Sequence, residues 1–320
     1  DVQWLSQGEG KIIARLKTLI MPSATPDIAQ LRTQGNFQEQ AEDYPALDVV
    51  ADSFEIAQKK LGRLELLASE RNEDWSIEKL RISNPESTLN AEGEWHNWIR
   101  SPNTRMTLTW TINDVGKTLD RFGYADIVKG GEANLTGQLK WPGSPHEFGL
   151  INLSGNLQMD ARKGQILKLK PGVGRLFSVL SLQNLPRRLT LDFRDIFSSG
   201  FAFDKISASV NIDHGVMRSD DFRMEGPTAL IRIRGETDLK TETQHLYVKV
   251  TPYISESLSL AALAGGPAVG AAAYLAQKLL KDPINKLAED EYEIVGTWDH
   301  PIEVNADKKP TTPEQNPLGQ

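Results

Sequence analysis

LRISNPESTLNAEGEW, residues 80–95, occurs a second time in the chain as FRMEGPTALIRIRGET, residues 222–237, with no gap between the copies. The identical residues are Arg81/Arg223, Pro85/Pro227, Gly93/Gly235 and Glu94/Glu236. Apolar positions keep the same offset on both sides, from Leu64/Ile206 and Leu66/Ala208 to Met106/Val248 and Leu108/Val250. About forty-five residues therefore recur at one offset, which is typical of modular stacking rather than of a single closed fold.

Each copy alternates apolar and polar residues with period two, which predicts three or four strands joined by turns. Pro85 and the Gly226-Pro227 pair mark the turns, whereas Gly93 and Gly235 interrupt strands and predict a bulge or close backbone packing. The same glycine-centred strand pattern recurs at 133–141, 151–159 and 291–299. One face of the resulting sheet is apolar along its whole length, and such a face needs a cover.

Composition limits the classes of function. The chain has 320 residues, of which 39% are hydrophobic and 25% charged, with a net charge of −7 and no basic stripe, so nucleic acid is not an expected partner. The absence of cysteine excludes disulfides, thiolate zinc sites and a cysteine nucleophile. Because the chain starts at Asp1 without a signal sequence, we expect a fragment of a longer protein whose signal or anchor lies upstream.

We expect three regions along the chain: a segment of uncertain structure at 1–45, a β domain at 46–304 and a disordered tail at 305–320. Within the β domain, the duplicated meander occupies 62–112 and 204–254. Patterning predicts helices at 114–124, with Asp114 as N-cap, and at 173–182. Strands are predicted at 130–141, 150–160, 164–169, 189–193 and 245–251, with one last strand in 291–304; residues 12–21 predict either a short helix or a strand pair.

The segment 254–281 is an unusual insertion. Residues 258–277 are uncharged and long enough for a membrane span, but Gly265-Gly266-Pro267 would break a helix in the middle. We therefore expect two short helices, either packed on the sheet or lying at a membrane surface. The residues expected to contact membrane or cap the sheet are Leu258, Leu260, Leu263, Val269, Tyr274, Leu275, Leu279 and Leu280.

The sequence contains no recognisable catalytic constellation. Its five histidines are scattered, most beside turns, and none has the i, i+4 spacing of a helical metal pair. The GVGR run at 172–175 lacks the Lys-Ser/Thr of a P-loop, and residues 198–200 have no GxSxG frame. We expect no catalytic residue, no metal site and no cofactor, and hence a protein that is not an enzyme.

The apolar sheet face remains as the candidate site. Either a second sheet or helices cover it in a β-sandwich, or the sheet curls into an open groove whose lining is available to acyl chains, each CH₂ of which gains about 0.8 kcal/mol on burial. The candidate lining residues are Leu64, Leu66, Leu80, Ile82, Leu89, Met106, Leu108, Leu135, Leu139, Leu153, Leu157, Ile206, Ala208, Val210, Phe222, Met224, Ile231, Ile233, Val248 and Val250.

Several blocks of sequence resemble one family in the family's own order: GRLFSVLSLQNLPRRLTLDFRDIFSSGFAFDKI (174–206), MEGPTAL (224–230), GGPAVGAAAYLAQKLL (265–280) and YEIVGTWDHPIEV (292–304). These blocks are similar to the C-terminal region of the YhdP family of AsmA-like proteins of Gram-negative bacteria. GGEANLTGQLKWPGSP (130–145) resembles the AsmA-type repeat. The resemblance covers about residues 46–304.

This resemblance implies an elongated, mainly-β groove like that of bridge-like lipid transfer proteins. It implies a periplasmic protein held in the inner membrane by an N-terminal anchor outside this chain, which moves glycerophospholipid between inner and outer membranes and supports the outer-membrane permeability barrier. The chain would be the end distal to the anchor, with phospholipid and the outer membrane or an outer-membrane protein as partners. The alternative is a structural β-sandwich that docks on an outer-membrane partner without binding lipid.

Overall fold

The computed structural model describes residues 2–5, 10–21, 44–71, 74–96, 102–167, 200–253 and 290–304. The sequence expectations for a helix at 173–182, a strand at 189–193, the insertion 254–281 and the tail 305–320 lie outside these residues.

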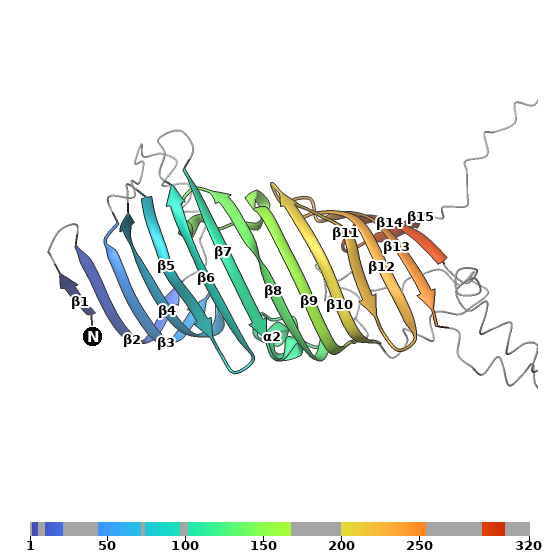
Figure 1. Ribbon diagram of the computed structural model, residues 1–320, viewed down its shortest axis with the longest axis horizontal. Coiled ribbons are helices and arrows are strands. Elements are labelled where there is room, and N and C mark those ends of the chain that lie inside the picture. The colour runs from blue at the N-terminus through green and yellow to red at the C-terminus, as the bar shows by residue number, and fades with distance from the viewer. Residues whose placement is uncertain are drawn as a thin grey trace, which may run out of the picture.

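Every strand in the described residues belongs to a single sheet, and the strand order in that sheet follows the order in the chain (Figure 1). The strands are Val2–Leu5 (β1), Lys11–Met21 (β2), Ala46–Ile56 (β3), Lys59–Arg71 (β4), Asp74–Ser83 (β5), Ser87–His96 (β6), Asn103–Ile112 (β7), Val128–Pro142 (β8), Ser154–Ile166 (β9), Phe201–Asp213 (β10), Val216–Glu225 (β11), Ala229–Asp238 (β12), Thr243–Pro252 (β13), Asp290–Thr297 (β14) and Pro301–Val304 (β15). The expected mainly-β, curved and unclosed sheet is confirmed.

The helical elements of the described residues are short. The α-helix α2 (Val115–Arg121) connects β7 to β8, and the 3₁₀ turns Pro145–Glu147 and Leu150–Asn152 lie between β8 and β9. None of the described helices is long and apolar enough to cross a membrane.

The duplicated sequence folds as a duplicated structure. Strands β4, β5 and β6 recur as β10, β11 and β12, each beginning and ending 142 positions after its counterpart. The pairing irregularity recurs as well, between Ile77 and Leu80 in the β5–β6 pair and between Ser219 and Phe222 in the β11–β12 pair. A bulge at the same place in both copies bends the strand and increases its twist.

The expected match of Met106 with Val248 is wrong by two residues. Met106 lies opposite Gly93 in the β6–β7 pair, and the residue opposite Gly235 in the β12–β13 pair is Leu246. The second copy has a connection that is two residues shorter, from 238 to 243 instead of 96 to 103. Because side chains alternate with period two, a shift of two leaves the same face apolar.

Three further expectations differ from the structure in their boundaries. Residues 12–21 belong to the single strand β2, and residues 150–152 form a 3₁₀ turn before β9, which extends through 164–166. The expected last strand is the hairpin of β14 and β15, because the His300 N–H donates to the Thr297 carbonyl and turns the chain between them.

Strands β2 and β3 interrupt the antiparallel order. They pair in parallel, with Ile12 opposite Leu47, whereas every other neighbouring pair in the described sheet is antiparallel. Arg15 of β2 forms an ion pair with Asp48 of β3 at 2.8 Å, and this arginine holds the pKa of the Asp48 carboxyl below its ordinary value. Parallel neighbours cannot be joined by the tight hairpin turn that serves antiparallel neighbours.

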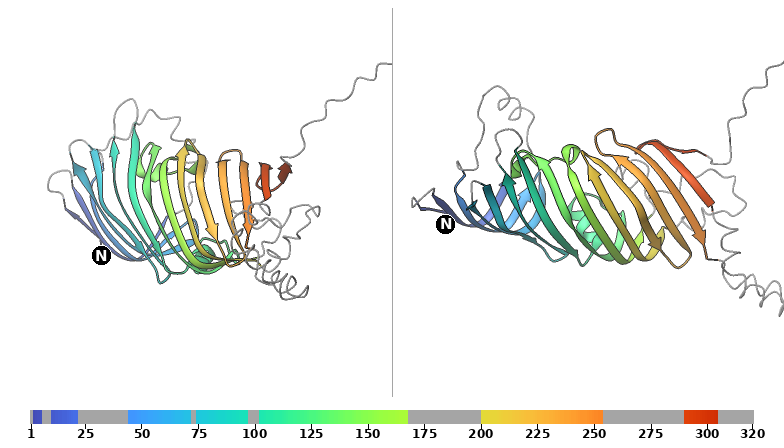
Figure 2. Two further views of the ribbon diagram at one scale, coloured as in Figure 1. Left: turned by 45° about the vertical axis from the view of Figure 1, so that its right-hand side comes forward. Right: turned by 45° about the horizontal axis from the view of Figure 1, so that its top comes forward.

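The sheet is curved into an open trough, as the rotated views show (Figure 2). Tyr44, which precedes β3, packs edge to face on Trp95 of β6, with ring centroids 5.1 Å apart. In a flat sheet β3 and β6, which are three places apart, would be separated by about 14 Å. Because Tyr44 and Trp95 nevertheless touch, the sheet curves toward the side on which they lie. The face that carries Trp95 is therefore the concave face, and the three clusters of buried apolar side chains lie on it.

Candidate functional site: the apolar inner face

The inner face is the concave face of the sheet, defined by Leu66, Leu80, Ala91, Leu108 and the residues paired with them. Strand register places these four side chains next to one another from β4 to β7. The row continues through Gly137, Leu157 and Val210. A single apolar row thus crosses seven strands without a polar side chain.

Two further rows run parallel to this one and extend the apolar surface toward the margin where β7 ends. One consists of Leu64, Ile82, Leu89, Trp110, Leu135, Met159 and Ala208. The next consists of Ile112, Ala133, Ala161, Ile206, Met224, Ile231 and Val250. The rows together form a continuous strip that spans both copies of the repeat.

All the candidate lining residues named from the sequence lie in strands on this face, except Leu153, which directly precedes β9 and packs in the same core. Half-buried side chains concentrate in β4–β9: Leu66, Leu80, Ile82, Leu89, Leu108, Leu135, Leu139 and Leu157, with Val210 and Phe222 beyond. Fully buried ones concentrate in β10–β13: Ile206, Ala208, Met224, Ile231, Ile233, Val248 and Val250, with Leu64, Met106 and Leu153 before them. That these residues contact lipid stays a prediction.

The helical residues predicted to contact membrane or to cap the sheet, within 254–281, lie outside the described residues.

Sequence reasoning missed several inner-face residues, among them Trp75 and Ile77 on β5. The bulge explains the omission, since the apolar residues run Trp75, Ile77, Leu80 and Ile82, and the step of three breaks the alternation. Alternation within β10 would have identified the buried Ile212, but the buried Phe201 and Phe203 are separated from Ile206 by another step of three.

Glycines on the inner face allow neighbouring strands to approach closely. A Cβ atom added at Gly93, Gly137, Gly155 or Gly235 would overlap a carbonyl oxygen of the adjacent strand. Gly235 also has a φ of +133°, which side chains rarely adopt. The close packing expected at Gly93 and Gly235 is confirmed, and such kinks let a strand bend across the trough.

Helix α2 lies over one margin of the inner face. Asp114 caps the helix by accepting a hydrogen bond from the Lys117 backbone N–H at 3.0 Å, as expected from the sequence. That hydrogen bond is the main reason that the pKa of the Asp114 carboxyl is lowered. At the other end, Phe122 packs on Trp110 with ring centroids 5.7 Å apart. This margin is called the α2 rim.

Arg121 ties the helix to distant strands. Its guanidinium forms an ion pair with Glu86 at 2.6 Å and donates to the Lys60 carbonyl at the start of β4 at 3.0 Å. Because β4 lies three strands from β7 in the sheet, these contacts cross the trough and hold its curvature at the α2 rim.

The opposite margin, called the Trp rim, is where β4, β6, β8, β10, β12 and β14 end and the next strands begin. Trp75, Trp95, Thr104 and Trp141 are successive partners there. The indole N–H of Trp141 donates to the Ser144 carbonyl at 3.0 Å. The two rims therefore differ in chemistry: one carries a helix and the other a row of indoles.

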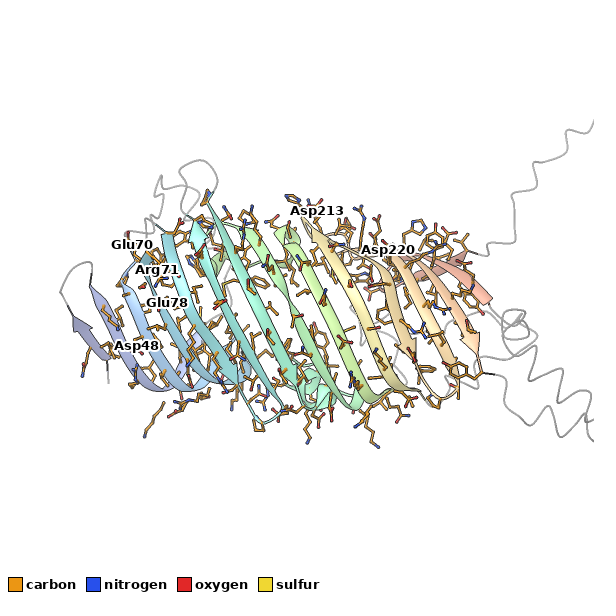
Figure 3. All side chains as sticks on the ribbon, in the orientation of Figure 1. Asp48, Glu70, Arg71, Glu78, Asp213 and Asp220 are labelled. Atoms are coloured by element: carbon orange, nitrogen blue, oxygen red, sulfur yellow. The ribbon has the colours of Figure 1, made fainter. Side chains whose placement is uncertain are left out.

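All five histidines of the chain lie at the Trp rim: His96 and His245 near strand ends, and His146, His214 and His300 in the connections between strands. His96 Nδ1 is 2.7 Å from Asp74 Oδ2, and His245 Nε2 is 2.7 Å from Glu293 Oε1. Glu70 and Arg71 at the end of β4 and Asp213 at the end of β10 lie along the same margin (Figure 3). Polar groups therefore border the apolar face on this side.

The outer face of the sheet is polar. Glu65 forms ion pairs with Arg63 at 3.4 Å and with Lys79 at 2.6 Å, and chiefly the hydrogen bond from Lys79 holds the pKa of Glu65 below its ordinary value. A shallow depression of ≈ 470 Å³ over β5–β7 includes Glu92 and Arg105 in its wall. Among the described residues, no group of three or more histidines and carboxylates is arranged to hold a metal ion.

Comparisons with known proteins agree with the expected family. The model of the YhdP protein family matches residues 1–303 of the chain. The intermembrane phospholipid transporter YhdP of Escherichia coli (strain K12) is 30% identical over 245 residues, which cover 76% of this chain and 19% of that protein. The chain thus spans about a fifth of the length of this curated relative. No solved structure matches the chain.

Proposed function

The chain belongs to the YhdP family, and on that premise we propose that its inner face holds the acyl chains of glycerophospholipids as one section of a conduit between the inner and outer membranes of a Gram-negative envelope. The observation that carries the proposal is an apolar strip that no other described strand covers: side chains such as Leu80, Leu108 and Leu157 are half-buried, and all described strands lie in one sheet. A second sheet, which a β-sandwich needs over this face, is absent from the described strands.

The physics of the inner face supports movement of lipid along it. Each CH₂ transferred from water to an apolar surface gains about 0.8 kcal/mol. The strip therefore lowers the free-energy cost of holding an acyl chain outside a bilayer. Because neighbouring rows are chemically alike, a lipid exchanges similar contacts as it passes from strand to strand. The glycines and α2 keep the sheet curved around the strip, and the mechanism requires no catalytic residue.

We place this section in the periplasm, within a protein anchored to the inner membrane upstream of the chain. The name of the Escherichia coli relative, which describes transport of phospholipid between membranes, supports this placement. We further propose that the insertion 254–281 either caps the groove or contacts the outer membrane or a protein in it. One section alone does not bridge two membranes, so transport is a property of the longer protein.

Native mass spectrometry of the purified chain tests the proposal. The chain is expressed in a Gram-negative host, purified without detergent and then incubated with phosphatidylethanolamine vesicles. We expect peaks heavier than the chain by the mass of one or more phospholipids, released as intact lipid on collisional activation. A chain that carries no lipid before or after incubation would favour a structural module that docks on a partner.

A further inference from the structure

The Trp rim contains buried polar groups without hydrogen-bond partners. Trp75 is 6% exposed and Trp95 2% exposed, and within the described residues the indole nitrogen of neither has a partner. Gln244, 5% exposed, has no partner for either atom of its side-chain amide. Buried tryptophan N–H groups usually find an acceptor, and each one left unpaired costs about 1–3 kcal/mol. These groups are therefore available to a partner from outside the described residues.

These groups occupy one margin of the inner face. Trp75 and Trp95 are partners in the β5–β6 pair, and Trp95 is opposite Thr104 on β7. In the second copy Gln244 pairs with Thr237, which corresponds to Trp95 by the 142-residue offset. Gln244 thus takes the place of Thr104. Polar tips line this margin in both copies, whereas the row through Leu66, Leu80 and Leu108 carries none.

We infer that the Trp rim binds the polar part of a glycerophospholipid, its ester and phosphate oxygens, while the acyl chains cross the inner face toward α2. The inference rests on the proposed function and adds an orientation to it. An indole N–H only donates hydrogen bonds, and ester carbonyl and phosphate oxygens accept them. Tryptophan is favoured where an apolar medium meets head groups, because its ring is apolar and its N–H is polar.

The dimensions of the inner face fit this orientation. On β6 the inner-face residues run from Trp95 through Gly93 and Ala91 to Leu89, a span of six residues or about 20 Å. One leaflet of a bilayer core is about 15 Å thick. If the esters of a lipid lie at Trp95, its acyl chains therefore end near Leu89 and Trp110, which are paired across β6 and β7. Phe122 of the α2 rim packs on Trp110 there.

Tyr44 packs against both indoles. Its ring centroid is 6.0 Å from that of Trp75 and 5.1 Å from that of Trp95. The inference therefore includes a shift of the Tyr44 ring when the lipid oxygens reach the indole nitrogens.

Photo-crosslinking with two lipids tests the orientation in the unmodified chain. One is a phosphatidylethanolamine with a diazirine on its head group, and the other carries the diazirine at the end of its sn-2 acyl chain. We expect the head-group probe to label peptides of the Trp rim (93–96 and 139–156) and the acyl-end probe to label peptides around Trp110 and Phe122.

The outcomes separate this inference from the proposed function. In one outcome the acyl-end probe labels the inner face, but the head-group probe labels the α2 rim, both rims equally or neither rim. That result overturns the orientation and leaves the proposed lipid-binding face intact. If neither probe labels the inner face, the proposed function fails and the orientation fails with it.

A pair of variants tests the role of the indole N–H groups. The double substitution Trp75→Phe/Trp95→Phe keeps aromatic rings and removes both donors, and we expect it to weaken lipid retention by on the order of tenfold. The matched control is Tyr247→Phe on the outer face, which likewise keeps an aromatic ring and removes a donor; it should retain lipid within about twofold of the wild type, because Tyr247 pairs with Arg234 on the face away from the strip. Equal retention by the double variant and the control would overturn the assignment of these donors.

Discussion

Phe122, the C-terminal cap of α2, packs edge to face on Trp110 of β7, with ring centroids 5.7 Å apart. The contact fixes the helix over one margin of the apolar face. Within the described residues no second layer holds the curvature of the sheet, so the few contacts that reach across the trough matter more than they would in a sandwich. The Arg121 contacts to Glu86 and Lys60 are of this kind, and the Phe122–Trp110 contact holds the helix that carries Arg121.

Phe122→Ala should therefore loosen α2 without unfolding the sheet. Loss of the half-buried ring should cost about 1–2 kcal/mol, less than the 3–5 kcal/mol typical of a fully buried phenylalanine. Hydrogen exchange would show faster exchange of the Thr118 and Phe122 amides while β8 and β9 stay protected. Equal loss of protection in helix and sheet would contradict a role limited to docking α2.

Asp114→Ala should destabilise the chain by about 1 kcal/mol at pH 7, because it removes the oxygen that accepts from the Lys117 N–H. The folded state lowers the pKa of this carboxyl, so the cap contributes fully above the unfolded pKa of about 3.9 and loses its contribution as pH falls through the folded pKa. Urea unfolding of both proteins at pH 7 and near pH 3 checks the sign. The difference between them should shrink at the lower pH; a constant difference would show that the ionised carboxylate is not the capping group.

Gly235→Ala should be among the most destabilising small substitutions in the sheet. The new Cβ would overlap the His245 carbonyl oxygen, and the backbone φ of +133° is unfavourable for alanine. We expect a loss of about 2–4 kcal/mol in urea unfolding. Gly149→Ala is the matched control, because its φ is −150° and its Cβ would come no closer than 3.9 Å to the Glu147 carbonyl oxygen. Equal losses in the two variants would refute the close-approach argument.

Leu108→Asp should reduce lipid retention, whereas Thr109→Asp should not. The two residues are neighbours on β7, but Leu108 is half-buried on the inner face and Thr109 is exposed on the outer face. A carboxylate on the strip would have to be desolvated by acyl chains, which is strongly unfavourable. Lipid is quantified by native mass spectrometry, and circular dichroism confirms that both variants fold. Similar retention by both would mean that acyl chains do not contact the inner face. Leu108 is preferable here to Met224, which is 1% exposed, because a charge at Met224 would disrupt folding itself.

Local sequence patterns predicted much of this fold and of its candidate face. The repeat around Gly93 and Gly235 predicted two equivalent meanders, and period-two alternation predicted which side chains share a face, because both depend on neighbours in sequence. The cap at Asp114 was also predictable, since it involves residues three positions apart.

Features that depend on distant pairing were not predictable in this way. The parallel pairing of β2 with β3 joins residues that are distant in sequence, such as Ile12 and Leu47, and the two-residue offset of β13 depends on the length of a connection. The step of three residues between Ile77 and Leu80 concealed Trp75 from an alternation search. The Trp rim emerges only when strand ends that are far apart in sequence are placed on one margin.

The central claim, that acyl chains occupy the inner face, is tested most directly by a crystal structure of the chain loaded with a phospholipid brominated along its acyl chains. Anomalous scattering locates the bromine atoms independently of the protein. The account predicts bromine peaks within about 4 Å of Leu80, Leu108 and Leu157. Bromine found only on the outer face, or an inner face filled by the protein's own side chains, would contradict it.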